Sequence, residues 1–303
     1  MSVDAADIRV VEPGTKVTTR IRDLIRYHEL IVNLVRKELR VKYKNSVLGF
    51  VWSMLNPAMT IAIFWIVFTK FLGNSIPTYP IWILSGILAW NLWQGSLGMS
   101  VASFLGNSSL VTKVYFPREA LPLASIGANL MHFFFQFFVL LAALVIFRFP
   151  ISLATLVLVP TALLTELLVL CGFCLIVAVM NVYFRDVQHL LELTLLAWFW
   201  MTPIVYQVAF PIQHLGKIST ILPKIYMLNP MTSIVLAFQR GIYQHISYLD
   251  RSTTPPTHVQ LLFHQGILWY LRNLGIVAVA AVVMIAIGWA IFRRLEWRLA
   301  EEL

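Results

Sequence analysis

Six long apolar stretches, separated by short polar segments, constrain this chain more than any other feature. About 20 apolar residues cross the hydrocarbon core of a bilayer as a helix. The predicted spans are residues 50–71, 80–103, 121–147, 153–182, 190–210 and 267–292. Hydrophobic residues make up 59% of the 303 residues and charged residues only 12%, whereas about a quarter of a soluble domain is charged. The sequence therefore predicts an all-α polytopic membrane protein with six transmembrane helices.

The basic residues gather on one side of this predicted arrangement. Six spans place both chain ends on the same side, and cytoplasmic loops of membrane proteins are rich in Lys and Arg. With the N-terminus inside, 16 of the 23 Lys and Arg residues fall on the inner side, and 10 of these lie in residues 1–49. Both termini are therefore predicted to be cytoplasmic. This placement accounts for the net charge of +9 without nucleic acid as a partner.

The segment before the first span divides into two parts. Residues 1–19 are predicted to be a disordered tail, and no signal peptide is expected, because the first apolar run follows dozens of polar and basic residues. Residues 20–47 predict an amphipathic helix in the membrane interface; a soluble helix that packs on another protein is the alternative. Its apolar stripe comprises Ile21, Leu24, Ile25, His28, Ile31, Val32, Val35 and Leu39.

The remaining residues, 48–303, form the predicted transmembrane domain. Within it, the region 211–262 on the outer side holds two apolar pieces that Pro211, Pro223 and Pro230 interrupt. Each piece is too short to span, which is typical of re-entrant or interfacial helices. The stretch "RSTTPPTHVQ", residues 251–260, predicts an exposed loop.

Motifs for enzyme chemistry are weak in this sequence. The stretch "GNSSLVTK" (106–113) lacks the second glycine of a phosphate-binding loop, so no ATP site is predicted. Cys171 and Cys174 lie within the fourth span and are interpreted as packing residues. The seven histidines show no metal-binding spacing, and His28 and His132 are interpreted as packing or interfacial residues. No catalytic or metal site is therefore predicted.

Polar side chains within the spans leave two open questions. Glu166 is a carboxylate inside the fourth span, where an ionisable group is costly and often functional. The equal alternative is a structural residue, either snorkelled towards the outer interface or protonated. Ser96, Ser100 and Ser103 recur at helical spacing, which favours close packing of helices.

Four stretches in order carry a resemblance to a known family. They are "RKELRVKYKNSVLGFVWSMLNPAM" (36–59), "LVTKVYFPREALPLAS" (110–125), "NVYFRDVQHLLELTLLAWFWMTPIVY" (181–206) and "LNPMTSIVLAFQRGIY" (228–243). From about Arg20 onward the chain resembles the ABC-2 permeases that export polysaccharides such as O-antigen, teichoic acid, capsule and mycobacterial galactan. The resemblance implies a permease without its own ATP site. Glu166 and the first 19 residues have no counterpart in that pattern.

The resemblance implies a set of partners. It implies a homodimer of this chain in the bacterial cytoplasmic membrane, two copies of a separate ABC ATPase that binds ATP and Mg, and a lipid-linked polysaccharide as substrate. The loop at about 107–120 resembles the coupling helix that sits on the ATPase. Proline stiffness and rigid aromatic anchors suit this role, whereas an ordinary basic loop is the alternative. The predicted coupling residues are Lys113, Tyr115, Phe116, Pro117, Arg118 and Glu119.

Aromatic residues suggest where a glycan could pass. Sugar rings stack on aromatic faces, although aromatics also form interfacial belts and helix contacts. The predicted channel residues are Phe64, Trp65, Phe68, Trp198, Phe199, Thr202 and Tyr206. Leu195, Phe199, Thr202 and Tyr206 are expected to share one helical face.

Three other functions remain open at this stage. An ABC-2 exporter of a drug or small lipid would share the coupling logic but need less channel. A membrane glycosyl- or acyltransferase would need an acid and base pair, for which Asp186 and His189 are the candidates. A pore without an ATPase is the third.

Overall fold

The computed structural model describes residues 22, 24–44, 46, 49, 51–71, 76, 78–114, 116–244, 247–250, 257–296 and 299–302. Its α-helices are α2 (His28–Tyr43), α3 (Val51–Trp65), α4 (Tyr79–Val101), α5 (Ser108–Lys113), α6 (Ala120–Ile146), α7 (Leu153–Tyr183), α8 (Val187–Trp200), α9 (Ala209–Ile218), α10 (Leu222–Met227), α11 (Pro230–Ile242), α12 (Ile267–Leu295) and α13 (Leu299–Glu302). A π-helical segment (Ile66–Phe71) continues α3, and a 3-10 turn (Leu105–Asn107) precedes α5. Strands β1 (Ser247–Asp250) and β2 (Thr257–Gln260) pair antiparallel. The predicted all-α class is confirmed, and the predicted tail, residues 1–19, lies outside the described residues.

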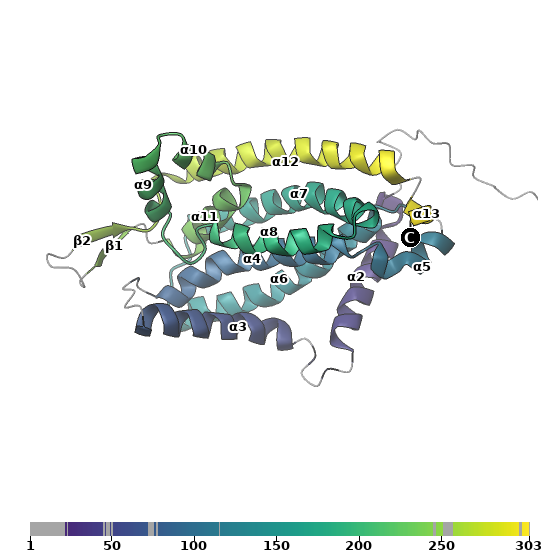
Figure 1. Cartoon of the computed structure of the whole chain (residues 1–303). Helices are drawn as coiled ribbons and strands as arrows, with labels where there is room; N and C mark the ends of the chain where they lie inside the picture. Colours follow the sequence, from purple (N-terminus) through teal and green to yellow (C-terminus); the bar gives the residue numbers. More distant parts are fainter. Residues whose placement is uncertain are drawn as a thin grey trace, which may run out of the picture.

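Six helices run side by side along the molecule (Figure 1): α3, α4, α6, α7, α8 and α12. Helices α2, α5 and α13 lie at one end, which we call the α2 end, and the strand pair lies with α9 and α10 at the other, the hairpin end. Helix α7 packs against α4, α6, α11 and α12. A Cβ atom on Gly288 of α12 would lie 2.9 Å from the carbonyl oxygen of Gly172 on α7. The two backbones therefore touch at this point, as small residues permit in membrane helices.

Three helices are long and apolar enough to cross a membrane, judged by length and composition: α6, α7 and α12. They coincide with the predicted spans 121–147, 153–182 and 267–292. Helices also occupy the other three predicted spans. Val51–Phe71 is α-helical and then π-helical, and α4 runs from Tyr79 to Val101.

The fifth predicted span, 190–210, is interrupted. Helix α8 ends at Trp200 and the chain bends over residues 201–206, where Pro203 has no backbone N–H to continue a helix. The Nε2 atom of Gln239 on α11 donates to the carbonyl oxygens of Pro203 and Ile204, at 3.0 and 3.3 Å. The expectation that Leu195, Phe199, Thr202 and Tyr206 share one helical face is therefore wrong, because the last two lie beyond the helix.

The interface helix forms, but its buried face differs from the predicted stripe. Leu34 is the residue of α2 that is buried, and Leu30, Ile31 and Val35 pack beside it against α6 and the α2 end of the bundle. Ile25 and Val32 are exposed instead, at 68% and 42%. Ile31 and Val35 of the predicted stripe thus pack inward with Leu34, and the position of the helix in the membrane interface stays a prediction.

The 211–262 region is more ordered than the sequence indicated. Helix α11 is almost wholly buried, with 11 of its residues in the core. Its start is defined by Asn229, whose side chain accepts from the Met231 amide at 3.0 Å, and by Pro230 in the first turn. The predicted loop at 251–260 is wrong in its last part, because Thr257–Gln260 pairs with Ser247–Asp250 as β2.

Candidate functional site

A polar cavity of about 820 Å³ lies among α2, α3, α4, α6 and α8. A second cavity of about 400 Å³ adjoins it, because Asn91, Gln94 and Glu192 line both. We call the two together the amide groove. One end is lined by Lys42 of α2, and the other reaches Phe199 of α8. The groove therefore follows the bundle from the α2 end towards the hairpin end.

The polar lining of the groove comes from two apolar helices. Asn129, His132 and Gln136 follow one another at i, i+3 and i+7 on α6, and all three are buried. Asn91 and Gln94 hold a matching position on α4. Residues with this spacing share one face of a helix. The carboxamide side chains of α4 and α6 thus line the same cavity.

Hydrogen bonds fix these carboxamides. The Nδ2 atom of Asn91 donates to Oε1 of Gln136 at 3.0 Å, and Nε1 of Trp90 donates to Oε1 of Gln94 at 2.9 Å. Asn129 donates to the carbonyl oxygen of Ser125 at 2.9 Å. A carboxamide offers two N–H donors and two acceptor lone pairs, so each retains capacity for a ligand. The arrangement suits an uncharged ligand rich in hydroxyl groups.

Gly95 of α4 lies against the side chain of Asn129 of α6 in the groove. A Cβ atom at this position would overlap the Oδ1 atom of Asn129 and lie 3.1 Å from its Cγ. Gly98, one turn further along α4, also lines the groove, but no atom lies within 4 Å of a Cβ built there. Only the first of these two glycines is required by packing.

The α2 end of the groove carries a small cluster of ionisable residues. The Nζ atom of Lys42 lies 3.2 Å from Nε2 of His132, and the hydroxyl of Tyr43 lies 3.1 Å from Nδ1 of the same ring. The rings of Tyr43 and His132 meet edge to face with centroids 5.8 Å apart. The interpretation of His132 as a simple packing residue is therefore incomplete.

Most predicted channel residues lie away from the groove. Phe199 lines it and meets Trp90 edge on, with centroids 5.6 Å apart. Trp198 packs against Trp93 and Phe173 instead and donates to Oδ1 of Asn229 at 2.8 Å.

The other members of the predicted set fall elsewhere. Thr202 is fully buried, and its hydroxyl donates to the carbonyl oxygen of Trp198. Tyr206 donates to the carbonyl oxygen of Trp200 and contacts Tyr226. Trp65 is 40% exposed on α3, and the side chains of Phe64 and Phe68 lie outside the described residues. The groove residues Asn91, Gln94, Asn129 and Gln136 were missed, although amides at helical spacing in apolar helices were a readable signal.

The predicted coupling residues divide into inner and outer positions. Phe116 and Glu119 are buried, at 4% and 1% exposure. Lys113 is exposed at the end of α5, beside Val114 at 52% exposure. Pro117 and Arg118 are half-buried, and Tyr115 lies outside the described residues. An interaction with a partner at this surface would therefore use α5 and its end more than Glu119.

Two hydrogen bonds hold the end of α12, one from Arg118 in the predicted coupling segment and one from Tyr183 at the end of α7. The Nη1 atom of Arg118 donates to the carbonyl oxygen of Glu296. The hydroxyl of Tyr183, at the end of α7, donates to the carbonyl oxygen of Leu295 at 2.6 Å. The final carbonyls of a helix have no partner within the helix, so Arg118 and Tyr183 satisfy two of them for α12.

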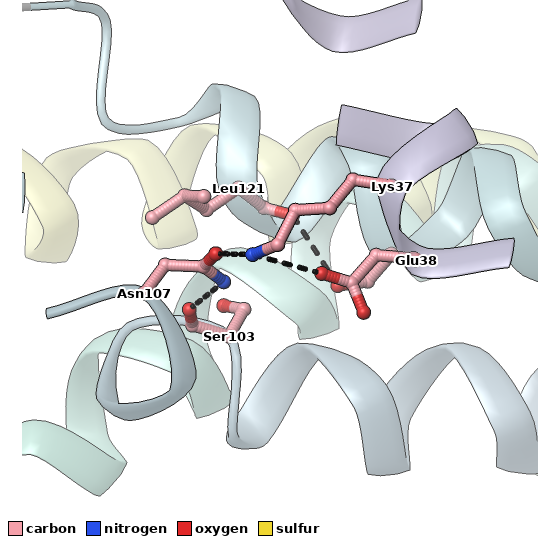
Figure 2. Close-up of polar contacts among 6 residues, drawn as sticks. Lys37, Glu38, Ser103, Asn107 and Leu121 are labelled. Atoms are coloured by element: carbon pink, nitrogen blue, oxygen red, sulfur yellow. Dashed lines mark hydrogen bonds and ion pairs between the residues drawn. The ribbon is translucent and has the colours of Figure 1, made fainter. Parts of the chain in front are cut away.

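The interface helix contacts the same segment from the other side (Figure 2). Lys37 of α2 donates to Oδ1 of Asn107, and Asn107 donates from Nδ2 to the carbonyl oxygen of Ser103 at 2.8 Å. Glu38 lies beside Lys37, with an N to O distance of 3.7 Å. Asn107 is buried and joins α2 to the turn that leads into α5.

Glu166 lies in the interior of α7 and is fully buried. Neither carboxylate oxygen has a hydrogen-bond partner within the described part of the chain. Full burial contradicts the snorkelled alternative and agrees with a protonated structural residue. A buried carboxyl without a partner lowers stability, and none of the contacts shows why it is present.

The other polar residues of the spans serve packing. The hydroxyl of Ser100 donates to the carbonyl oxygen of Cys174 at 3.1 Å, and both cysteines are free thiols. The interpretation of Cys174 and Ser100 as packing residues is confirmed. No group of three His, Cys, Asp or Glu side chains that could hold a metal ion occurs among the residues described above.

Comparison with known proteins agrees with this architecture. A sequence profile of the family described as ABC-2 type transporter matches residues 29–243. That range covers more than half of the chain and includes helices α2 to α11. The chain belongs to the ABC-2 type transporter family.

Three similar proteins carry the same name, O-antigen export system permease protein RfbA. The O-antigen export system permease protein RfbA of Myxococcus xanthus is 32% identical over 226 residues, which is 74% of this chain and 84% of the relative. Two proteins of the same description from Klebsiella pneumoniae are 27% and 26% identical over 273 residues, which is 90% of this chain and 94% of each relative. The prediction of a permease from this family is confirmed.

Proposed function

We propose that this chain is the membrane-spanning subunit of an ATP-driven exporter that moves a lipid-linked polysaccharide across the bacterial cytoplasmic membrane. The amide groove is the observation that carries this proposal. Its carboxamides exchange hydrogen bonds with hydroxyl groups, and Phe199 with Trp90 offers ring faces. The relatives named as O-antigen export permeases support a glycan as the cargo.

The proposed topology has six spans, formed by α3 with its π-helical extension, α4, α6, α7, α8 and α12. We place the α2 end in the cytoplasm, because α2, Lys113, Arg118 and Arg293 bring positive charge to that end. Helices α9 to α11 form the proposed re-entrant region. Single cysteines that replace Lys113 and Lys217, in a background without Cys171 and Cys174, should label from opposite sides of the membrane. Labelling from the same side would contradict this topology.

The energy source in this proposal is a separate ABC ATPase that binds ATP and Mg. Two ATPase copies and two copies of this chain form the proposed complex. Helices α3 and α8 both line the groove, and in this proposal a second copy of the chain completes the path. The exposed end of α5 is the proposed contact with the ATPase, and α2 supports it through the Lys37 to Asn107 hydrogen bond.

Replacement of one groove amide tests the proposed cargo. The Asn91→Leu variant should lower export of a lipid-linked glycan from cells, since it removes the hydrogen bond to Gln136 and a ligand contact. The matched control is Asn273→Leu, because Asn273 is an amide of membrane helix α12 with one hydrogen bond, to the carbonyl oxygen of Trp269. Export is measured per inserted complex. An equal response of the two variants would refute the groove as the glycan path.

A further inference from the structure

Gly98 is a residue of the groove whose presence the fold does not explain. A glycine within a helix is unfavourable relative to alanine, because its backbone loses more freedom on folding. Two structural needs commonly justify it, a positive φ or a neighbour too close for a Cβ atom. Gly98 has neither: among the described residues Gly49 is the glycine with a positive φ, and no atom lies within 4 Å of a Cβ built on Gly98. The space beside Gly98 belongs to the groove.

The stripe of α4 that lines the groove ends at Gly98. Asn91, Gln94, Gly95 and Gly98 recur at i, i+3, i+4 and i+7, so they share one face of the helix. The first two carry carboxamides, and the side chain of Asn129 fills the space beside Gly95. Gly98 is exposed and has no such neighbour. It is therefore the point of the stripe where the bare backbone of α4 lines the groove.

A third cavity, of about 360 Å³, lies among α2, α4 and α6 towards the α2 end, and we call it the inner cavity. On α4 the two linings adjoin in sequence, because Met99 lines the inner cavity and Gly98 lines the groove. On α2 they adjoin in the same way at Val41 and Lys42. The two cavities therefore follow one another along the bundle, and Gly98 lies at the level where one gives way to the other.

We propose that Gly98 is a specificity-determining residue of the exporter, because its missing side chain sets the width of the groove at this level and thereby the bulk of the sugar residues that pass. This inference rests on the proposed function. A sugar ring can lie flat against a bare helical backbone, while its hydroxyl groups, which both donate and accept, reach the carboxamide of Gln94 one turn away. Each atom added at position 98 takes volume from the passage, so the limit on the cargo is steric.

Export by a graded series of variants tests this role. Gly98→Ala, Gly98→Val and Gly98→Leu add side chains of increasing size, and export of the host cell's own lipid-linked glycan is measured at the cell surface per inserted complex. Export should fall in that order, by at least about tenfold for Gly98→Leu, which is the discrimination that one misplaced methylene group gives in a fitted site. If Gly98→Leu does not insert, the decline from Gly98→Ala to Gly98→Val decides.

Gly275→Leu is the matched control on another membrane helix. Gly275 of α12 also has no atom within 4 Å of an added Cβ, but it lines neither the groove nor the inner cavity. This variant should export within about twofold of the unmodified chain, as is usual for an exposed position without partners. An equal loss in Gly98→Leu and Gly275→Leu would overturn the inference, because added bulk on any membrane helix would then have the same effect.

Gly98→Asn separates the width of the groove from its polarity. The side chain of asparagine has the same branched shape as that of leucine, yet it adds a carboxamide like those already in the groove. A steric limit predicts a loss of export as large as that of Gly98→Leu, and normal export by Gly98→Asn would overturn the inference. Thermal unfolding checks for a structural role: no variant at position 98 should unfold at a lower temperature than the unmodified chain, and a loss of export that follows a loss of stability would also overturn the inference.

Comparison with Asn91→Leu separates this inference from the proposed function. Loss of export in Asn91→Leu with normal export in Gly98→Leu would overturn the role of Gly98 alone and leave the groove as the glycan path. Normal export in both variants would refute the groove as the glycan path and the role of Gly98 with it.

Discussion

Substitution of Gly95 by alanine tests whether the observed contact between α4 and α6 is required. The new Cβ would overlap Oδ1 of Asn129, which is buried and hydrogen-bonded to the carbonyl oxygen of Ser125. Either Asn129 turns away and loses that bond, at about 1 kcal/mol, or the helices separate, and overpacking of a core costs about 1–3 kcal/mol. Alanine returns about 1 kcal/mol through its higher helix propensity. The expected net destabilisation is about 0–2 kcal/mol.

Gly98→Ala is the matched control on the same helix. No atom lies within 4 Å of a Cβ at Gly98, so this change should be neutral or slightly stabilising. Both variants gain the same helix propensity, so their free energies of unfolding should differ by about 1–3 kcal/mol, the cost of the overlap at Gly95 alone. Reversible unfolding of the purified chain in mixed micelles gives both values. Adding Asn129→Ala to Gly95→Ala should restore part of the loss, as coupled neighbours do. A Gly95→Ala variant as stable as Gly98→Ala would refute the packing argument.

Four further substitutions have defined expectations. Glu166→Leu should raise the free energy of unfolding by about 1–3 kcal/mol, because it removes a buried carboxyl without a partner; a less stable variant would show that the carboxyl has a favourable contact. Asn229→Ala should lower stability by about 2–4 kcal/mol, since the Trp198 indole loses its acceptor and α11 its N-cap, and thermal unfolding measures the loss. Lys113→Glu should weaken copurification of the ATPase at unchanged stability, whereas Glu119→Ala should lower stability because Glu119 is buried; the reverse pattern would contradict the division into inner and outer positions.

The sequence predicted the long helices well, because the length of an apolar stretch alone determines whether it can span a membrane. The spans at 121–147, 153–182 and 267–292 match α6, α7 and α12, because a predominantly apolar stretch of more than 25 residues has few other solutions. The end of α8 was missed, since the bend after Trp200 depends on Gln239, a partner far away in the sequence. The face of α2 that packs on the protein could not be predicted for the same reason: contact with α6 buries Leu34.

The site was less predictable than the fold. Aromatic residues drew the prediction towards Trp198 and Thr202, yet these pack within the protein. An indole and a polar side chain inside a span are equally suited to packing and to ligand contact, so residue type alone does not separate the roles. The amides at 129 and 136 carry a clearer signal, because their periodicity places them on one helical face. Their proximity to Asn91 of α4 depends on how α4 and α6 pack, which the sequence pattern does not show.

The contacts of Arg118 and Tyr183 with the end of α12 have an evolutionary consequence. Both side chains donate to main-chain carbonyls, of Glu296 and Leu295. Every residue type supplies such a carbonyl, so this hydrogen bond does not depend on the side chain at position 296. Position 118 should therefore show no covariation with position 296 across relatives, although the two residues touch. Shortening the chain before Leu295 removes both acceptors at once, so selection at this junction acts on chain length instead of side-chain identity.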